Sequence, residues 1–225
     1  QVGALADTQL AALSILQLAA LNATNLSALD ETQMAGISAT QIKGLTNTQL
    51  KGLSTTDIAE LSATQVSALT TGQITAFATT ALQALSTTQV AALSTAQLGA
   101  LTATSFSALA DTQVAALSTT QVKGLTVNQI KGLSTTDIGE LFDTQIAALT
   151  TSQIAALSAT VIGGLTETQV GSLQGTQIAS LTVSQLDNLT TTSISALTAT
   201  QAAALTTTQV QSLSDPQIVA YLGVS

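Results

Sequence analysis

A hydrophobic residue recurs at every eighth position of this chain, from Leu5 to Tyr221, without an insertion or a deletion. A second apolar column lies three residues before the first and runs from Val2 to Ile218. One repeat unit reads L-[S/T]-x-T-Q-[I/V/L]-x-A, for which residues 85–93, LSTTQVAAL, are an example. Strict repetition at so short a period is typical of a solenoid, in which each repeat buries its apolar residues only against neighbouring repeats.

The eight-residue period argues against one long helix and against ordinary strands. A continuous α-helix turns by about 100° per residue, so apolar residues at this period would wind around the helix axis. Coiled coils need apolar periods of about 3.5 or 3.67 residues. Strands need apolar and polar residues in alternation, whereas many octads, such as residues 85–92, have four consecutive polar residues and an alanine-rich end. A β-solenoid stays open as the alternative fold.

The repeat unit predicts one very short helix in each octad, because Ser or Thr follows the leucine and Gln stands three residues later, as in a capping box. In the octad that begins at Leu85, Ser86 is expected to accept from the N–H of Gln89, whose side chain returns to the N–H of Ser86. The expected fold is therefore all-α, an α-solenoid of very short capped helices. A weaker helix start is expected where the capping side chain is missing, at Ala6, Ala78, Ala110, Phe142, Gln174 and Leu222.

The sequence predicts a single tandem-repeat solenoid over residues 1–225, with about 28 octads and no linker. The first residue falls within an octad and is not a Met, so we expect a segment of a longer array. Isolated helices of fewer than about 12 residues are marginally stable, so neighbouring octads must stabilise one another. We expect two octads in each coil of the solenoid. Small residues before the leucine, such as Ala92, Gly124 and Gly132, are expected to let successive helices approach closely.

Composition argues against most enzyme chemistry and against nucleic-acid binding. The chain has no His, Cys or Trp, and its 4 basic and 12 acidic residues give it a net charge of -8. No base is present to activate a Ser or Thr nucleophile, and few ligands for a transition metal are available. We therefore expect no enzyme activity, no catalytic residue, no cofactor and no metal. Phosphate binding needs clustered Lys or Arg, so nucleic acid is not an expected partner. No segment reaches the roughly 18 consecutive apolar residues of a membrane-spanning helix, so no transmembrane segment is expected.

A longer repeat of eighty residues lies above the octad, because the segment that begins at Gln41 resembles the segment that begins at Gln121. The Gln column is also broken at Ala81 and again at Val161. One interpretation is block duplication with solvated charges. The other is a pair of equivalent charged patches that contact a neighbouring molecule. The residues of the two patches are Lys43, Lys51, Asp57 and Glu60, and Lys123, Lys131, Asp137 and Glu140.

Two polar columns are further candidates for binding. A Thr column runs from Thr8 to Thr208, and a Gln column runs from Gln1 to Gln217. In one interpretation the Thr residues fill the first helical turn and the Gln residues complete capping boxes. In the other, the two columns are exposed ladders that bind a second copy of the chain, a glycan, or ordered water as ice-binding surfaces do.

Several octads carry a resemblance to known repeats, among them LTTSQIAAL from Leu149 and LTTTQVQSL from Leu205. They resemble the L-[S/T]-x-x-Q-[I/V]-x-A-L tandem repeats of very large bacterial secreted or cell-surface proteins described as adhesin-like or RTX-like. The resemblance covers the whole chain, although this sequence has neither the calcium-binding nonapeptides nor the secretion tail of RTX proteins. It implies an extracellular, cell-associated stalk, fibre or matrix component of a bacterium. It assigns no catalytic, cofactor-binding or metal-binding residue.

The function expected from the sequence is structural. We expect an extracellular repeat protein that forms a stiff stalk or a self-assembling surface filament, with a role in adhesion or biofilm. Its expected partner is a second copy of itself, joined end to end or side by side. The first alternative is a solenoid module that recognises a glycan, a cell surface or ice. The second is an intracellular interaction scaffold, which the scarcity of aromatic and Arg residues disfavours.

Overall fold

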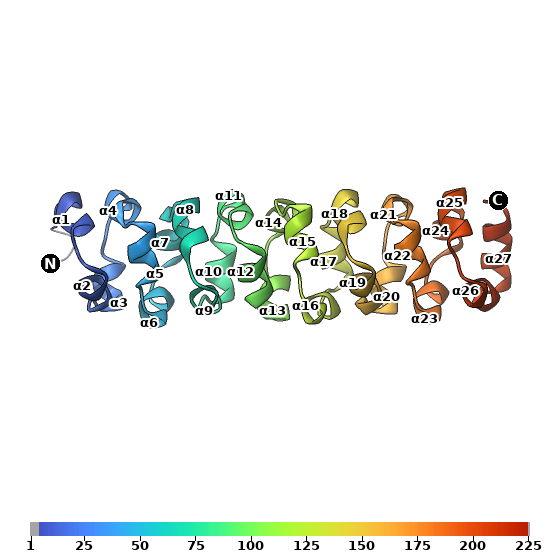
Figure 1. Ribbon diagram of the computed structural model, residues 1–225, viewed down its shortest axis with the longest axis horizontal. Coiled ribbons are helices and arrows are strands. Elements are labelled where there is room, and N and C mark those ends of the chain that lie inside the picture. Colours follow the sequence, from blue (N-terminus) through green and yellow to red (C-terminus); the bar gives the residue numbers. More distant parts are fainter. Residues whose placement is uncertain (1–4, 225) are drawn as a thin grey trace. The chain divides into compact units, whose positions relative to one another are not determined.

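The computed structural model describes residues 5–224 of the chain. It contains two compact units, Gln1–Leu117 and Ser118–Ser225, and each unit is a stack of short helices (Figure 1). The octad register continues through this boundary in the sequence, and one uninterrupted array stays a prediction. Gln1 and Val2, with which two of the columns begin, lie outside the described residues.

The described residues form 27 α-helices and no strand, which confirms the α-solenoid and excludes the β-solenoid alternative for residues 5–224. Nearly every helix has four to six residues, as the capping boxes predict. The helices of the first unit are α1 Asp7–Ala11, α2 Ile15–Ala19, α3 Ala23–Leu26, α4 Glu31–Gly36, α5 Ala39–Lys43, α6 Asn47–Lys51, α7 Thr55–Glu60, α8 Ala63–Ala68, α9 Thr71–Ile74, α10 Thr79–Gln83, α11 Thr87–Ala91, α12 Thr95–Ala100, α13 Ala103–Ser107 and α14 Asp111–Ala115. Those of the second unit are α15 Thr119–Lys123, α16 Val127–Lys131, α17 Thr135–Gly139, α18 Asp143–Ala148, α19 Thr151–Ala156, α20 Ala159–Gly163, α21 Glu167–Ser172, α22 Gly175–Ala179, α23 Val183–Asp187, α24 Thr191–Ser195, α25 Ala199–Ala203, α26 Thr207–Ser212 and α27 Asp215–Leu222.

Each coil of the solenoid contains three octads, so the prediction of two was wrong. Helix α5 packs on α8, α8 packs on α11, and α11 packs on α14. The same spacing of three joins α15 to α18 and α18 to α21 in the second unit. Every octad carries the same apolar pattern, so nothing in the sequence distinguishes a coil of two from a coil of three.

The two apolar columns form the core of each unit. Leu18 and Ile58 in the second column have no exposed surface, and Leu85 and Leu101 in the first column are 3–4% exposed. Burying a Leu or Ile side chain contributes roughly 1.5–3 kcal/mol, and each octad places two such residues in the core. Because a helix of five residues is unstable alone, this packing between coils is what holds the helices together.

The caps follow the sequence prediction closely. Ser86 accepts a hydrogen bond from the backbone N–H of Gln89, and the Gln89 side chain accepts from the N–H of Ser86. Pro216 lies in the first turn of α27, where its missing N–H is tolerated. No side chain caps the helices whose N-cap residues are Ala6, Ala78, Ala110, Phe142 and Gln174, as expected. Leu222 is the last residue of α27 and therefore starts no helix.

Adding a cap at Ala110 is expected to stabilise the first unit. Gln113 already accepts a hydrogen bond from the Ala110 N–H, so Ala110→Ser would complete the capping box of α14. We expect the free energy of unfolding to rise by about 1 kcal/mol, as measured by urea denaturation followed by circular dichroism. The matched control is Ser86→Ala, which should lower the free energy of unfolding by a similar amount. If Ala110→Ser and Ser86→Ala changed the free energy of unfolding in the same direction, this explanation of the helix starts would be contradicted.

Small residues allow close contact between coils, rather than between successive helices. A Cβ atom added at Gly52, the C-cap of α6, would lie 2.3 Å from the Cβ of Ala23, the first residue of α3. A Cβ atom added at Gly163, the last residue of α20, would lie 2.5 Å from the backbone oxygen of Asn188. These helices are three octads apart, so the close approach follows from the three-octad coil.

Candidate functional site

The Gln column is the most regular polar feature of the fold, and it lies inside the solenoid. Gln97 is 3% exposed, and its Oε1 atom accepts from the backbone N–H of Ser94 at 2.8 Å. Its Nε2 atom donates to the backbone oxygens of Val66 at 3.1 Å and Leu69 at 2.7 Å. One carboxamide therefore caps its own helix and binds two carbonyl groups of the preceding coil. We call this arrangement the glutamine clip.

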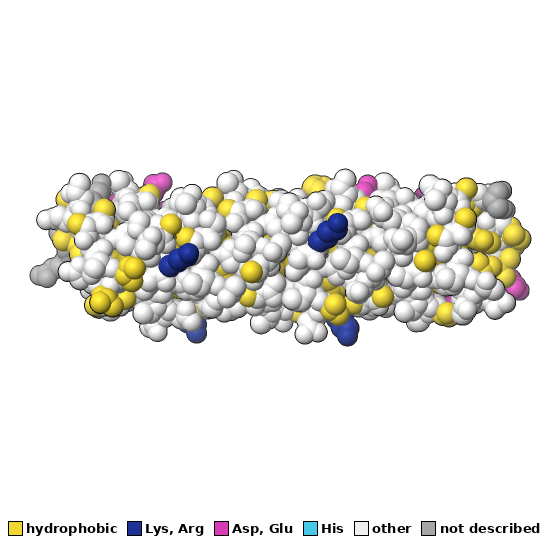
Figure 2. All heavy atoms as spheres, viewed as in Figure 1, with side chains coloured by type: hydrophobic (Ala, Val, Ile, Leu, Met, Phe, Trp, Pro, Cys, Tyr) yellow, Lys and Arg dark blue, Asp and Glu magenta, His cyan; other side chains and the backbone are white. Residues whose placement is uncertain are grey.

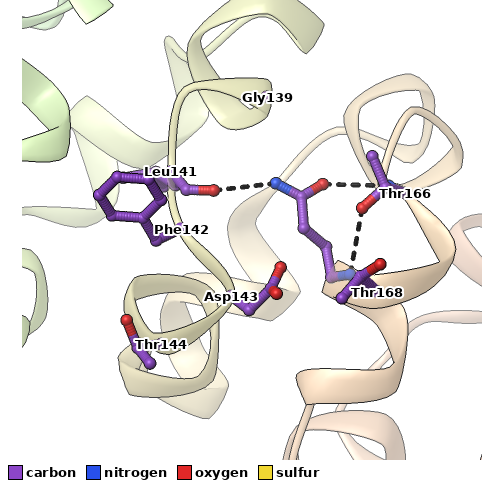
Figure 3. Close-up of a pocket in the computed structure, with 8 residues that line it drawn as sticks. Gly139, Leu141, Phe142, Asp143, Thr144, Thr166 and Thr168 are labelled. Carbon is purple, nitrogen blue, oxygen red and sulfur yellow. Dashed lines mark hydrogen bonds between the residues drawn. The ribbon is translucent and has the colours of Figure 1, made fainter. Parts of the chain in front are cut away.

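The same clip recurs in both units. Gln41 donates to the oxygen of Leu13, and Gln201 donates to the oxygen of Leu173. In the second unit, Gln169 donates to the oxygen of Leu141 at 3.0 Å and accepts from the N–H of Thr166 at 3.0 Å (Figure 3). The acceptors stand 28 and 31 residues before the Gln. They belong to the coil three octads earlier, where they lie near the end of the helix that precedes the equivalent octad.

The burial of the Gln column corrects one of the two ladders expected for binding. From Gln33 to Gln217, the Gln side chains of this column have 1–5% of their surface exposed. The carboxamide groups of Gln41, Gln97, Gln169 and Gln201 are occupied by the clip, and buried side chains cannot present an exposed ladder to a glycan or to ice. The capping-box interpretation is therefore the correct one for Gln, and it misses the two bonds to the preceding coil.

The Thr column, in contrast, lies on the surface. Thr40 in α5, Thr64 in α8, Thr88 in α11 and Thr112 in α14 are all exposed. Because these four helices pack on one another in this order, their Thr residues form a row that runs from coil to coil. Figure 2 shows one face of the molecule, on which backbone atoms and side chains that are neither hydrophobic nor charged together cover most of the surface.

The four lysines of the charged patches are exposed. Lys43 and Lys51 lie in the last turns of α5 and α6, and Lys123 and Lys131 lie in the last turns of α15 and α16. A positive charge at the C-terminal end of a helix is favourable, because it offsets the negative end of the helix dipole. Whether these lysines contact a neighbouring molecule stays a prediction.

Two acidic residues of the patches are buried, contrary to an exposed contact surface. Asp57 occupies a Gln position and is 5% exposed, and Asp137 occupies the equivalent position and is 8% exposed. The Oδ2 atom of Asp57 accepts from the Ser54 N–H at 2.7 Å and from the Ser27 hydroxyl at 2.5 Å. Ser27 therefore supplies the donor that a carboxylate lacks. Asp57 and Asp137 belong to the interior, and the sequence alone does not reveal this.

The other two acidic residues, Glu60 and Glu140, are half-buried. The Glu60 Oε2 atom is inaccessible to solvent and has no hydrogen-bond partner among the described residues. Burial raises the pKa of Glu60 above its ordinary value, and the negative charges of Asp57, Glu31 and Asp30 raise it further. Protonation of this carboxyl group is therefore easier in the folded chain than in the unfolded chain.

Glu60→Gln is expected to stabilise the chain at neutral pH. Because the pKa of Glu60 is higher in the folded state than in the unfolded state, the folded state loses stability as pH rises from the ordinary value of 4.5 through the raised value. The variant removes this cost, so its urea midpoint should exceed that of the parent chain at pH 7 and match it near pH 4. A Glu167→Gln control, at an exposed position of α21, should show no such gain. A gain that is independent of pH would contradict this explanation.

The described residues contain no group of three or more His, Cys, Asp or Glu side chains placed to hold a metal ion. None of the helices within residues 5–224 has both the length and the hydrophobicity needed to span a lipid bilayer. Two open depressions lie between coils, each with a volume of about 510 Å³. One of them lies beside Phe142 and Thr168 in the second unit (Figure 3).

Comparison with known families supports the repeat assignment. A family model described as the ALTTAQ repeat matches the chain twice, at residues 45–79 and 71–103. The matched segments contain ALTTGQ at residues 68–73 and ALSTAQ at residues 92–97. The six letters of the family name therefore include the leucine, the N-cap residue and the Gln of the octad. Together the matches span about a quarter of the chain. No curated protein matches the sequence. The chain is therefore a protein of tandem short helical repeats, similar over residues 45–103 to the ALTTAQ repeat.

Proposed function

We propose that this chain is a structural element of a bacterial extracellular or cell-surface protein, in which the repeats supply length and stiffness. The observation that carries the proposal is the glutamine clip. In the clip of Gln97, one buried carboxamide joins its own coil to the preceding coil by hydrogen bonds to two backbone oxygens. A stack in which every contact is made between neighbours can be lengthened by adding octads, without any change to the rest.

The surface of the chain supports the same proposal. Ser and Thr dominate the exposed positions, and only 7% of the residues are charged. We propose no catalytic role, because the chain lacks His and Cys and its buried polar groups are used in the clip. As a surface protein it would serve in adhesion or biofilm, either as a stalk or as a filament formed with further copies of itself.

Electron microscopy of the native material tests this proposal, with sedimentation of the purified chain alongside. Straight particles of uniform width on the cell exterior are the expected result. Long filaments would identify the chain as the building block of a fibre, and single rods would identify it as a spacer. Flexible or collapsed particles, or a protein found only inside the cell, would overturn the proposal.

A second candidate function rests on the exposed Thr rows. The row of Thr40, Thr64, Thr88 and Thr112 presents one hydroxyl and one methyl group per coil at regular spacing, which suits ordered water or a repetitive glycan. The first unit contains a natural control. The row through α3, α6, α9 and α12 begins with Thr24 and Thr48, but then has Gly72 and Ala96.

Replacing three residues of the complete Thr row is expected to abolish such binding. The variant carries Thr40→Ala, Thr64→Ala and Thr88→Ala, and it is assayed by ice affinity and on a glycan array. Thr24→Ala with Thr48→Ala, in the interrupted row, should leave binding unchanged. The circular dichroism spectrum of both variants should match that of the parent chain, because the Thr column is exposed. Unbound parent chain in both assays would rule this function out.

A further inference from the structure

The octad of residues 77–84 lacks both halves of the capping box. It has Ala78 where most octads have Ser or Thr, and Ala81 where they have Gln. No side chain caps α10, whose N-cap is Ala78. Because it has no Gln at position 81, this octad has no glutamine clip. The backbone groups that such a clip would bind are nevertheless present.

Those groups are identified by the spacing of the neighbouring clips. Gln73 donates to the oxygen of Leu45, 28 residues earlier, and to the oxygen of Ile42, 31 residues earlier. The same spacing from Ala81 leads to the oxygens of Leu53 and Leu50. The third group is the backbone N–H of Ala78, which would donate to the Oε1 atom of a Gln at position 81.

These three backbone groups have unused hydrogen-bonding capacity. The Leu53 oxygen and the Ala78 N–H make no hydrogen bond among the described residues. The Leu50 oxygen accepts one hydrogen bond among the described residues, from the Leu53 N–H at 3.3 Å. The equivalent oxygen of Ile42 accepts the same kind of bond and a second one from the Gln73 side chain. Leu53 is 8% exposed, whereas Leu61 and Leu69 in the next two octads are 3% exposed. Unsatisfied polar groups at a partly opened position favour a ligand that can pair with all of them.

A cavity of about 510 Å³ lies at this position. It is lined by all four residues of the missing clip, Leu50, Leu53, Ala78 and Ala81, together with the buried Phe77. Its mouth is bordered by exposed polar side chains, which are Lys51, Thr55, Thr75 and Thr80. The cavity is therefore larger than one carboxamide and opens to solvent.

Loss of the Gln does not by itself create such a cavity. Val161 also replaces a Gln, in the octad of α20, but its side chain is 3% exposed and fills the position. The backbone N–H of Val161 donates to the Ser158 hydroxyl, so α20 keeps its cap. Of these two breaks in the Gln column, only the one at Ala81 leaves the cavity open and the cap missing.

We propose that this cavity binds a primary carboxamide, such as the side chain of a peptide glutamine. The carboxamide oxygen would accept from the Ala78 N–H, and its NH₂ group would donate to the oxygens of Leu50 and Leu53. A carboxylate has no donor for the two carbonyl oxygens and is repelled by their dipoles. An apolar group leaves the Ala78 N–H and the Leu53 oxygen unpaired and adds no donor for the Leu50 oxygen. The site thus accepts from outside the same group that the other octads supply themselves.

Nuclear magnetic resonance titration of the full chain tests the proposal. The probes are N-acetyl-glutamine methylamide, its glutamate counterpart, and propionamide as a free small amide. We expect the glutamine probe to shift the amide signal of Ala78 and the carbonyl signals of Leu50 and Leu53 saturably. For ligands of this size the dissociation constant should be on the order of millimolar, and the glutamate probe should bind at least about tenfold more weakly. Saturation by propionamide as well would show that a free amide suffices.

Two variants separate binding from folding. Ala81→Gln should fill the cavity with its own carboxamide, raise the thermal midpoint and abolish the shifts caused by the glutamine probe. Thr87→Ala, at an exposed position of the next octad, should leave both the fold and the shifts unchanged. The proposal is overturned if neither amide causes a saturable shift, if glutamate binds as well as glutamine, or if Ala81→Gln folds normally and still binds the probe.

Discussion

Replacing Gln97 with leucine is expected to lower the free energy of unfolding by roughly 3–5 kcal/mol. The Gln97 side chain accepts from the Ser94 N–H and donates to the oxygens of Val66 and Leu69. Leucine has a similar volume but no polar atom, so the Ser94 N–H and the Leu69 oxygen would be left unpaired, and the Val66 oxygen would keep only its bond from the Leu69 N–H. Each buried unpaired group costs roughly 1–3 kcal/mol.

Gln17→Leu is the matched control for this prediction. Gln17 stands in the same column and accepts from the Ser14 N–H at 2.9 Å, but its side chain is exposed and donates no hydrogen bond among the described residues. Its replacement should cost only about 1 kcal/mol, the value of a lost capping interaction. Urea denaturation of both variants measures the difference. Equal costs would show that the bonds between coils contribute nothing to stability, and the clip would lose its structural meaning.

The second prediction concerns two glycines at the same octad position with different surroundings. Gly163→Ala is expected to lower the free energy of unfolding by roughly 1–3 kcal/mol, because the added Cβ atom would lie 2.5 Å from the backbone oxygen of Asn188. Backbone atoms cannot move aside without shifting α23. Coil packing must therefore open to admit one methyl group.

Gly139→Ala should have the opposite effect. Gly139 is the last residue of α17, as Gly163 is of α20, but no atom lies within 4 Å of its added Cβ atom. Alanine there removes backbone freedom from the unfolded chain without creating a contact, so the free energy of unfolding should rise by about 0.5–1 kcal/mol. Thermal unfolding of the two variants in parallel checks the pair. Destabilisation by both would show that glycine is needed at this position for another reason.

The candidate binding cavity illustrates how far the sequence leads. The breaks of the Gln column at Ala81 and Val161 are visible in the sequence, and so is the missing cap at Ala78. Which carbonyl groups a Gln at position 81 would reach depends on the number of octads in a coil. The two breaks differ only in three dimensions, because Val161 fills its position and Ala81 does not. The cavity could therefore not be predicted before the coil was known.

The charged patches show the same limit. Asp57 and Glu60 read as surface charges, because acidic residues are mostly exposed. In the structure Asp57 takes the place of a Gln and accepts from Ser27, a residue of the preceding coil. A position that is polar in nearly every octad cannot be distinguished by sequence pattern from a solvent-facing one.

The sequence by itself determined where each helix begins and which two apolar columns form the core, because caps and apolar columns act within one octad or between identical ones. Only the tertiary structure decided that three octads make a coil, that the Gln column lies inside, and that one of its breaks is an open cavity. The physical reason is that helices of about five residues fold only by packing on the next coil. Contacts between residues 28 and 31 positions apart are set by that packing, and an identical pattern in every octad carries no record of it.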